Sequence, residues 1–393
     1  MIIAGGSYLE LCEVPRWRRI FGSGGRAAAA IGAMSPGSHL HTYAFAGWAR
    51  DVECSMQACG VGASVTSIEE EISFRYFHAL SAARLQPPAP TRHRPLSVEG
   101  PVVLRFGFVE GDAIVAAGRA IHDPQGDTAA FRANGSGTQT LAVVLNQGEA
   151  EAATGLDGPA AGEAILTLHQ ADLVVVKGGC TGATVHRPAL EPVAIPAYRS
   201  DKVFKIGSGD VFSAAFAHHW GERDVDPVTA ADLASRAVHH FVDTRSLPLP
   251  LATDDTADAL VPVGGEPGRI YLAAPFFDIA QRWLVEEARD RLQTLGASVF
   301  SPFHDVGTGG GAVALAEADL AGLDACDAVL ALLDGADPGS VFEVGHARAR
   351  GIPVVVLAER LDELHLTMLT GTGCEIVDDF ASALYRAVWA SIR

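Results

Sequence analysis

The stretch 337–347, Asp-Pro-Gly-Ser-Val-Phe-Glu-Val-Gly-His-Ala, has the residue types for carboxylate chemistry at a strand-loop-helix junction. The apolar run 328–333 before it predicts a buried strand, and residues 344–350 indicate the start of a helix. Glu343 would therefore lie near the carboxyl end of a strand, where open α/β sheets bind ligands. An ionised Glu with apolar neighbours can act as a nucleophile. A helix-capping role is the alternative, because acidic residues are common in first helical turns.

Two further carboxylates, Asp319 and Asp337, fall in the same part of the chain as Glu343. One ionised carboxylate can attack an anomeric carbon while a neighbour, kept protonated by mutual repulsion, donates a proton to the leaving group. Carboxylates gathered in this way would suit the cleavage of a glycosidic bond. Surface and capping roles are the alternative for each of them.

The elements that must position these carboxylates alternate in type. The expected strands are 270–273, 298–300, 328–333 and 353–357, and the expected helices are 281–295, 313–323 and 381–392. This alternation predicts an α/β fold with a smaller doubly wound, Rossmann-like or flavodoxin-like parallel sheet. The loops 271–278, 303–311 and 334–343 would then meet at one edge of that sheet.

The N-terminal half carries two motifs that could handle a phosphate. Asn146-Gln-Gly-Glu149 closes a predicted strand and opens a helix, so Glu149 could hold a hydrated Mg²⁺ beside a nucleotide phosphate. In the run 205–213, Lys-Ile-Gly-Ser-Gly-Asp-Val-Phe-Ser, glycines precede Asp210 at a helix start. Free amides there would face a transferring phosphoryl group, and Asp210 could accept a proton from the attacking hydroxyl. A structural glycine turn with a capping Asp is the alternative.

Alternating elements also surround these two motifs. The expected strands are 1–6, 101–109, 141–145 and 171–176, and the expected helices are 148–154, 162–169 and an Ala-rich helix opened by the glycines at 22–26. The pattern predicts a parallel sheet covered by helices. The segment 63–94 breaks this rhythm and could be a lid or an edge insertion.

Composition bounds the class of protein. A chain of 393 residues with 48% hydrophobic residues predicts two or three globular domains. The net charge of -18 argues against nucleic acid or an anionic membrane as a partner, because polyanions are bound through clustered Lys and Arg. The six cysteines are too scattered for a metal motif and too sparse for a disulfide framework. With neither a secretory leader nor a long apolar span in the sequence, we expect a cytoplasmic protein that acts on small molecules.

The character of the chain changes between residues 244 and 268, where prolines, glycines and acidic residues replace periodic patterns. We expect a linker at 246–268, with one domain at 1–245 and a second at 269–393.

The N-terminal motifs resemble those of a known enzyme family. Asn146 with Glu149, the strand 173–177 with its glycine-rich turn 178–183, and the run 207–210 are similar in order and spacing to ribokinase-like (PfkB-type) sugar kinases, over roughly residues 1–245. The resemblance implies a three-layer α/β/α kinase domain that uses ATP and Mg²⁺. The roles it implies are a catalytic base at Asp210, an anion hole at Gly207, Ser208 and Gly209, ATP contacts at Lys177, Gly178, Gly179 and Gly182, and a Mg²⁺ region at Asn146 and Glu149.

The chain departs from that family on the acceptor side. Phe204 and Lys205 stand where an Asp-Thr pair is usual, and Ser208 replaces Ala. Glu10 and Arg26 occur in the N-terminal segments where the family has its sugar-binding Asp and Asn. The residues for phosphoryl transfer are thus present, whereas the acceptor pocket is rebuilt.

The C-terminal motifs resemble a second family. The segments 269–278 (Arg-Ile-Tyr-Leu-Ala-Ala-Pro-Phe-Phe-Asp), 318–320 (Ala-Asp-Leu) and 337–347 are similar to nucleoside 2-deoxyribosyltransferases, over roughly residues 269–380. Relatives carry an Asn, which reaches a neighbouring subunit's site, in the region that here reads Leu-His-Leu-Thr-Met-Leu at 364–369. Recognition of the sugar's 5′ side therefore differs, and a 5′-phosphorylated substrate is one option.

This second resemblance implies a role for each carboxylate. Glu343 would take the (deoxy)ribosyl group from the base, Tyr271 would orient Glu343, and Asp319 and Asp337 would bind and protonate the base or hold sugar hydroxyls. No metal or other cofactor is implied for this step. Water would resolve the glycosyl-enzyme by hydrolysis, and a second base would resolve it by transfer.

The sequence therefore predicts a bifunctional enzyme of nucleoside or nucleotide metabolism, in which a kinase domain is fused to an N-glycosidase or deoxyribosyltransferase domain, and which we expect to be a homo-oligomer. The alternative is a nucleotide-binding sensor, in which a degenerate kinase domain regulates the glycosidase domain.

Overall fold

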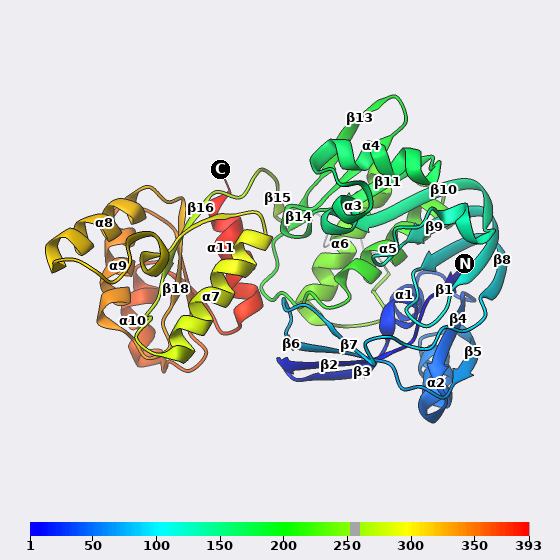
Figure 1. Ribbon diagram of the computed structural model, residues 1–393, viewed down its shortest axis with the longest axis horizontal. Helices are drawn as coiled ribbons and strands as arrows, with labels where there is room; N and C mark the ends of the chain where they lie inside the picture. The colour runs from blue at the N-terminus through cyan, green and yellow to red at the C-terminus, as the bar shows by residue number, and fades with distance from the viewer. Residues whose placement is uncertain (252–259, 393) are drawn as a thin grey trace. The chain divides into compact units, whose positions relative to one another are not determined.

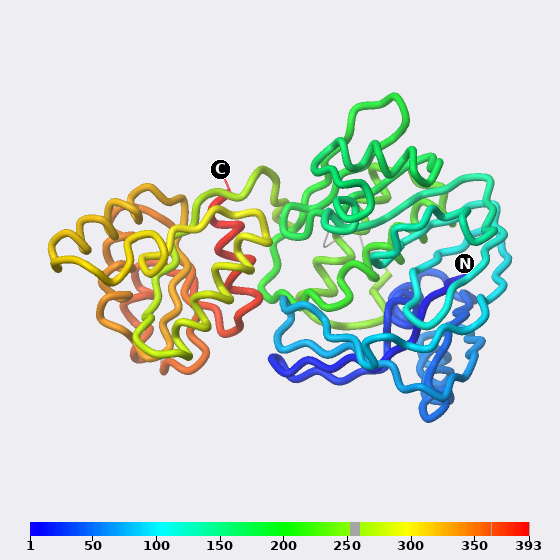
Figure 2. The backbone as a smooth tube through the Cα atoms, viewed as in Figure 1, coloured from blue at the N-terminus to red at the C-terminus, as the bar shows by residue number. Residues whose placement is uncertain are grey.

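The computed structural model describes residues 1–251 and 260–392 and divides the chain into two compact units, Met1–Pro262 and Val263–Arg393 (Figures 1 and 2). Residues 252–259 of the expected linker lie outside the described residues, so the bounds 1–245, 246–268 and 269–393 stay a prediction. None of the helices described is both long enough and apolar enough to cross a bilayer.

A nine-stranded sheet forms the centre of the first unit, in the order β13-β12-β11-β10-β9-β8-β1-β4-β5. The strands from β11 to β5 pair in parallel, and β12 and β13 pair antiparallel at one end. The strand bounds are β1 (Ile2–Ala4), β4 (His39–Phe45), β5 (Gly62–Ile68), β8 (Leu96–Phe106), β9 (Ala113–Asp123), β10 (Gly137–Asn146), β11 (Leu173–Lys177), β12 (Ala183–Arg187) and β13 (Leu190–Ile195). Parallel strands end at the same edge of a sheet, so the ends of β9, β10 and β11 bring their last residues together.

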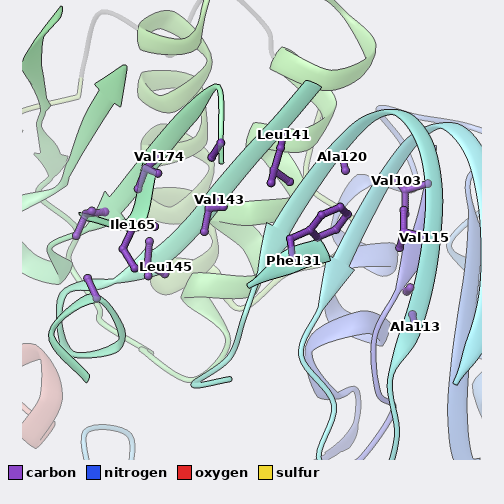
Figure 3. Close-up of a cluster of buried hydrophobic side chains, with 14 of the residues drawn as sticks. Val103, Ala113, Val115, Ala120, Phe131, Leu141, Val143, Leu145, Ile165 and Val174 are labelled. Atoms are coloured by element: carbon purple, nitrogen blue, oxygen red, sulfur yellow. The ribbon is translucent and has the colours of Figure 1, made fainter. Parts of the chain in front are cut away.

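Helices cover this sheet and complete the predicted α/β class. Their bounds are α1 (Gly22–Ile31), α2 (Ala49–Ala58), α3 (Gln147–Thr154), α4 (Gly158–His169), α5 (Ser208–Phe216) and α6 (Pro227–Thr244). Ile165 of α4 packs on Val143, Leu145 and Val174 in a closely packed apolar cluster (Figure 3), while α5 packs beside α1 and α6. Strands of a parallel sheet that helices cover are buried, so their sequences are almost continuously apolar.

A second, four-stranded sheet of this unit has the order β3-β2-β6-β7. Its strands are β2 (Leu9–Val14), β3 (Trp17–Ile20), β6 (Ser73–His78) and β7 (Arg84–Gln86). The segment 63–94 is thus divided, because β5 is the edge strand of the large sheet and β6 and β7 belong to the small one. Through β2, the small sheet carries Glu10.

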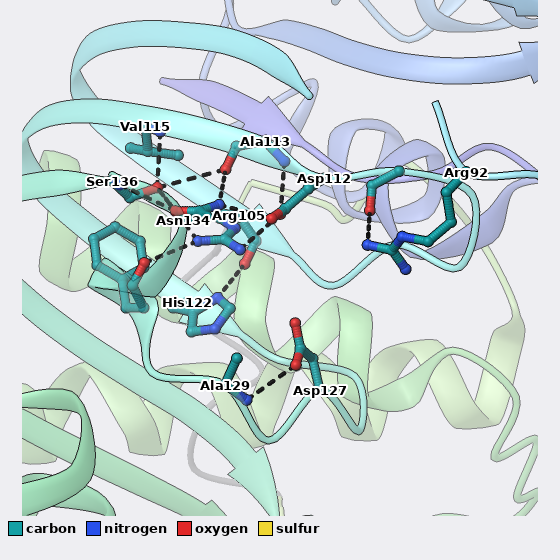
Figure 4. A network of polar contacts seen from close by, with 12 residues as sticks. Arg92, Arg105, Asp112, Ala113, Val115, His122, Asp127, Ala129, Asn134 and Ser136 are labelled. Atoms are coloured by element: carbon teal, nitrogen blue, oxygen red, sulfur yellow. Dashed lines mark hydrogen bonds and ion pairs between the residues drawn. The ribbon is translucent and has the colours of Figure 1, made fainter. Parts of the chain in front are cut away.

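A buried polar network ties β8 and β9 to the 3₁₀ turn Phe131–Asn134 (Figure 4). Arg105 donates to Asp112 at 2.7 Å, and Asn134 donates to the other oxygen of Asp112 at 2.8 Å. The ring of His122 faces that of His169, with centroids 5.7 Å apart, and Nδ1 of His169 accepts the Phe131 amide. Burial and the nearby guanidinium of Arg105 lower the pKa of both imidazoles, which favours their neutral forms.

The second unit is a five-stranded parallel sheet in the order β17-β16-β18-β19-β20, the doubly wound topology that the sequence predicted. Its strands are β16 (Arg269–Ala273), β17 (Ser298–Phe300), β18 (Ala328–Leu332), β19 (Val354–Leu357) and β20 (Glu375–Val377). Its helices are α7 (Ile279–Thr294), α8 (Ala312–Asp324), α9 (Pro338–Ala349), α10 (Glu363–Gly371) and α11 (Phe380–Ser391). β20 and α10 were not predicted, and α9 begins at Pro338, ahead of the expected start at 344.

Candidate active sites

Glu343 and Tyr271 form the centre of the site in the second unit. Tyr271 is fully buried on β16 and stacks on Phe300. Its hydroxyl donates to Oε1 of Glu343 at 2.8 Å, across the sheet edge from β16 to α9. Burial raises the pKa of Glu343 to about 7, the hydrogen bond from Tyr271 lowers it, and Asp319 and Asp337 raise it. Burial and the adjacent carboxylate raise the pKa of Tyr271, so its hydroxyl stays a donor.

Asp319 and Asp337 lie close enough to this pair to influence its charge. Asp319 on α8 has a pKa raised by burial, and its Oδ1 is buried without a hydrogen-bond partner among the described residues. A carboxyl group in this condition can stay protonated and donate to a ligand. Asp337 is the N-cap of α9, with Oδ2 accepting from the backbone and the hydroxyl of Ser340 at 2.8 and 3.1 Å.

Glu343 does not cap the helix that follows it. The cap of α9 is Asp337, followed by a proline at the first helical position, so Glu343 lies beyond the first turn and is free to face Tyr271. The residues expected at this edge, Tyr271, Asp319, Asp337 and Glu343, are therefore brought together. Two neighbouring carboxyl groups whose pKa values are both raised by burial have the composition of a glycoside-cleaving pair.

Asp210 is the buried carboxylate of the site in the first unit. It lies in the first turn of α5, whose N-cap, Gly207, has a φ of +81° that a glycine tolerates best. Its Oδ2 accepts from Nη1 of Arg26 at 2.9 Å, and Oδ1 accepts from Gln125 at 3.3 Å. Arg26 also forms an ion pair with Glu10 of β2. Burial raises the pKa of Asp210 to about 6, against the lowering effect of Arg26.

A second ion pair, Lys177 with Asp123, lies beside Asp210. Nζ of Lys177 donates to Asp123 at 2.8 Å, and Ser213 of α5 donates to the same oxygen at 2.6 Å. A Cβ built on Gly209 would lie 3.3 Å from Nζ of Lys177, so the ammonium stands over the start of α5. A cation beside a helix N-terminus suits an anion that binds both.

Asn146 and Glu149 form a capping box at the start of α3. Oδ1 of Asn146 accepts from the Glu149 amide at 2.9 Å, and Oε2 of Glu149 accepts from the Asn146 amide at 2.8 Å. No group of three or more His, Cys, Asp or Glu residues within 1–251 and 260–392 could hold a metal ion. A Mg²⁺ ion often takes only one or two protein carboxylates and completes its shell with phosphate and water, so Glu149 fits that limited role.

The glycine-rich turn after β11 is closed on itself. The Gly178 amide donates to the Gly182 carbonyl at 2.7 Å, and Gly182 has a φ of +100°. Gly179 begins a 3₁₀ turn that ends at Thr181. Because the amide of Gly178 is hydrogen-bonded within the turn, it is not available to donate to a nucleotide.

Three residues of the first site have no functional role in the sequence-based prediction. Arg26 and Glu10 were noted only as departures from a family pattern, and Asp123 was not singled out. Arg26 and Asp210 are far apart in the chain, so their pairing depends on α1 packing against α5. A charged residue inside the Ala-rich run 26–31 was the one available signal, because an unpaired Arg is costly in a buried helix.

The second unit combines a doubly wound parallel sheet with the Tyr271–Glu343 pair at one sheet edge. The family model of the nucleoside 2-deoxyribosyltransferases matches residues 270–381, in agreement with the resemblance in its sequence. No curated protein sequence matches the chain.

Solved structures similar to the chain, over roughly its N-terminal two thirds, are kinases. One is a pyrophosphate-dependent kinase of the ribokinase family complexed with a pyrophosphate analogue and myo-inositol, at 14% identity over 66% of this chain and 100% of that one, with a TM-score of 0.46. A second is a fructokinase from Vibrio cholerae O395 with bound fructose, ADP and calcium, at 13% identity over 62% and 94% of the two chains, also with a TM-score of 0.46. A third is a probable sugar kinase from Rhizobium etli CFN 42, at 11% identity over 66% and 97%, again with a TM-score of 0.46.

Proposed function

We propose that the second unit cleaves or transfers the N-glycosidic bond of a (deoxy)nucleoside or its monophosphate, with Glu343 as the nucleophile. The observation that carries this proposal is the 2.8 Å hydrogen bond from Tyr271 to Glu343, beside Asp319, whose Oδ1 has no hydrogen-bond partner in the part of the chain that the structure describes. The family match over 270–381 supports the substrate class.

The proposed chemistry assigns one step to each group. Ionised Glu343 forms a bond to the anomeric carbon as the bond to the base breaks, and Asp319 gives its proton to the departing base. Tyr271 holds the carboxylate in the attacking orientation. Water or a second base then takes the sugar from Glu343, and no metal or other cofactor is needed for either route.

We propose for the first unit that it phosphorylates a hydroxyl of a sugar or nucleoside. Asp210 would take the proton of the attacking hydroxyl, while Lys177 and the amides at the start of α5 meet the transferring group. ATP would supply the phosphoryl group, and Mg²⁺ held by Glu149 would offset its charge. The buried position of Asp210 at the head of α5 supports this assignment.

A second candidate function for the first unit is nucleotide sensing without phosphoryl transfer. The specific observation that favours it is the ion pair of Arg26 with Asp210, together with Gln125 on the other carboxylate oxygen. With both oxygens engaged, Asp210 would be a structural anion, and the first unit would bind a nucleotide in order to regulate the second.

The partners that we propose are small-molecule nucleosides, nucleotides or sugars, and further copies of this chain. Exposed apolar side chains on three helices of the second unit support a homo-oligomer, with Val313 72%, Phe342 64% and Met368 74% exposed. Large apolar side chains at this exposure commonly mark contact surfaces.

Base release tests the assignment of the second unit. The protein is incubated with each deoxynucleoside and each nucleoside monophosphate, and free base is measured by chromatography. Glu343→Gln should lower release by about 10³-fold or more, because the nucleophile is lost. Glu317→Gln, which removes an exposed carboxylate from α8, is the matched control. Equal release by Glu343→Gln would sink the assignment.

ATP turnover separates the two candidates for the first unit. Turnover that depends on an added sugar or nucleoside, and that is lost in Asp210→Asn, supports the kinase. Tight ATP binding without turnover supports the sensor. Glu151→Gln, which removes an exposed carboxylate from α3, is the control for general loss of charge.

A further inference from the structure

We propose that Arg26 and Glu10 are positioning residues that hold Asp210 with one oxygen fixed and the other presented to the acceptor hydroxyl. This inference rests on the proposed phosphoryl transfer by the first unit. Glu10 and Arg26 are residues in which the acceptor region of this chain departs from the sugar-kinase family, and the inference gives these two residues a function.

The guanidinium of Arg26 binds two carboxylates through its two terminal nitrogens. Nη1 of Arg26 donates to Oδ2 of Asp210 at 2.9 Å, and Nη2 donates to Oε2 of Glu10. Arg26 and Glu10 are both buried, with 1% and 4% of their surfaces exposed. A guanidinium is planar, so the hydrogen bond from Nη2 to Glu10 also fixes the direction from which Nη1 approaches Asp210.

The backbone of α5 is shaped around this guanidinium. A Cβ on Gly207 would lie 2.1 Å from Cζ and Nε of Arg26, so the N-cap glycine makes room for the side chain. Nε of Arg26 is buried without a hydrogen-bond partner among the described residues. A donor left open at the head of α5 is available to an oxygen of the bound acceptor.

The two oxygens of Asp210 are not equivalent. Oδ2 is held by the buried Arg26, whereas the hydrogen-bond partner of Oδ1 among the described residues is the side-chain amide of the exposed Gln125, at 3.3 Å. An acceptor hydroxyl can replace Gln125 without breaking the ion pair. Its proton then passes to Oδ1 as its oxygen bonds to the transferred phosphorus, and the phosphorus-oxygen bond to the nucleotide breaks.

Charged and titratable groups on several elements lie near enough to Asp210 to influence its charge. They are Arg26 of α1, Glu10 of β2, Tyr76 of β6, Asp123 of β9, Lys177 of β11 and Glu149 of α3. Arg26 stabilises the ionised form of Asp210, while Asp123 and Glu10 oppose it. Removal of Arg26 and removal of the Glu10 charge should therefore move the titration of Asp210 in opposite directions.

The test is a carbon-detected NMR titration of the full chain with ¹³C-labelled aspartate carboxyls. The Asp210 signal is assigned by its absence in Asp210→Asn. In the wild type it should titrate near 6. Arg26→Met should move the midpoint up by about 1–3 pH units. Glu10→Gln should move it down, because the amide can still accept from Nη2 while the charge is gone.

Arg26→Lys keeps the charge and should return the midpoint toward the wild-type value. If Arg26→Met does not fold, Arg26→Lys and Glu10→Gln still decide the matter. Unchanged midpoints in Glu10→Gln and Arg26→Met, or shifts of the same sign in these two variants, would overturn the positioning role.

Where the wild type turns over ATP with an acceptor, the acid limb of kcat/KM for the acceptor should follow the same shifts. If it does not turn over, the proposed kinase function fails, and the titration still decides whether Arg26 and Glu10 position Asp210.

Discussion

At the scale of single residues, the base release that we propose for the second unit depends on how much of Glu343 is ionised. Burial raises its pKa to about 7, and only the ionised form is a nucleophile. Base release should therefore rise as the pH increases through about 7 and be lost as the pH falls below it. A kcat/KM profile between pH 5 and 9 checks this expectation. A rate that is flat from pH 5 to 7 would contradict it.

Tyr271→Phe should reveal what the hydroxyl does for Glu343. The hydrogen bond lowers the pKa of Glu343, so its loss should move the acid limb to higher pH. Hydrogen bonds to charged groups contribute about 1.5–3 kcal/mol, which corresponds to a fall in kcat/KM of roughly tenfold to more than a hundredfold. The ring stacked on Phe300 is retained, so stability should change little. Tyr385→Phe, which removes a hydroxyl from α11, is the matched control, and an equal loss there would refute the assignment.

Asp337 acts at the scale of one element, because it begins α9. Asp337→Ala should lower the free energy of unfolding by about 0.5–2 kcal/mol through the lost cap, whereas Asp337→Asn keeps an oxygen for the Ser340 amide. Asn also removes a charge that raises the pKa of Glu343, so the acid limb should move to lower pH. Urea unfolding and the pH profile of each variant separate the two effects. Asn as destabilising as Ala would show that the cap requires the charge.

The polar network between β8, β9 and α4 predicts loss of stability in acid. Burial lowers the pKa of His169 to about 4, and Nδ1 must stay unprotonated to accept the Phe131 amide. Between pH 6.5 and 4 the unfolded chain binds a proton that the folded chain does not. Stability from this group is thus complete above pH 6.5 and falls by up to about 1.4 kcal/mol per pH unit below it.

Urea unfolding of wild type and His169→Gln across pH 4–8 measures this contribution. Glu110, with a pKa raised by burial to about 7, works in the opposite direction in the same unit, so the difference between the two proteins is the relevant quantity. The variant should be less stable at pH 7 and should lose less on acidification. Parallel curves would exclude His169 as the source.

At the scale of the whole molecule, the sequence predicted most of the features that follow from a parallel sheet. Tyr271 and Glu343 meet because β16 and β18 pair in parallel and end at the same sheet edge, which the alternation of elements already implied. The start of α9 was placed too late, although Pro338 after Asp337 is a helix-start signal. The strand β9 was not predicted, because its several Ala residues and a Gly lack the β-branched pattern that is typical of strands.

Contacts between distant segments were beyond the reach of sequence patterns. Asp210 was placed at a helix start, but nothing in its neighbourhood shows that Arg26 of α1 would pair with it. Glu149 and Asn146 fit a metal site and a capping box equally well by type and spacing, and the structure shows the box. Local pattern thus fixes elements and edges, whereas tertiary packing selects each charge partner.

The two units should also differ in whether their activities are coupled. Each has a hydrophobic core of its own, around Val143 in the first and Val329 in the second. If the first unit is a kinase, Asp210→Asn should abolish acceptor-dependent ATP turnover and leave base release from a supplied nucleoside unchanged, while Glu343→Gln should do the reverse. If it is a sensor, ATP should alter the rate of base release in the wild type. Comparing base release with and without saturating ATP, in wild type and Asp210→Asn, decides between a pair of independent catalysts and a regulated one.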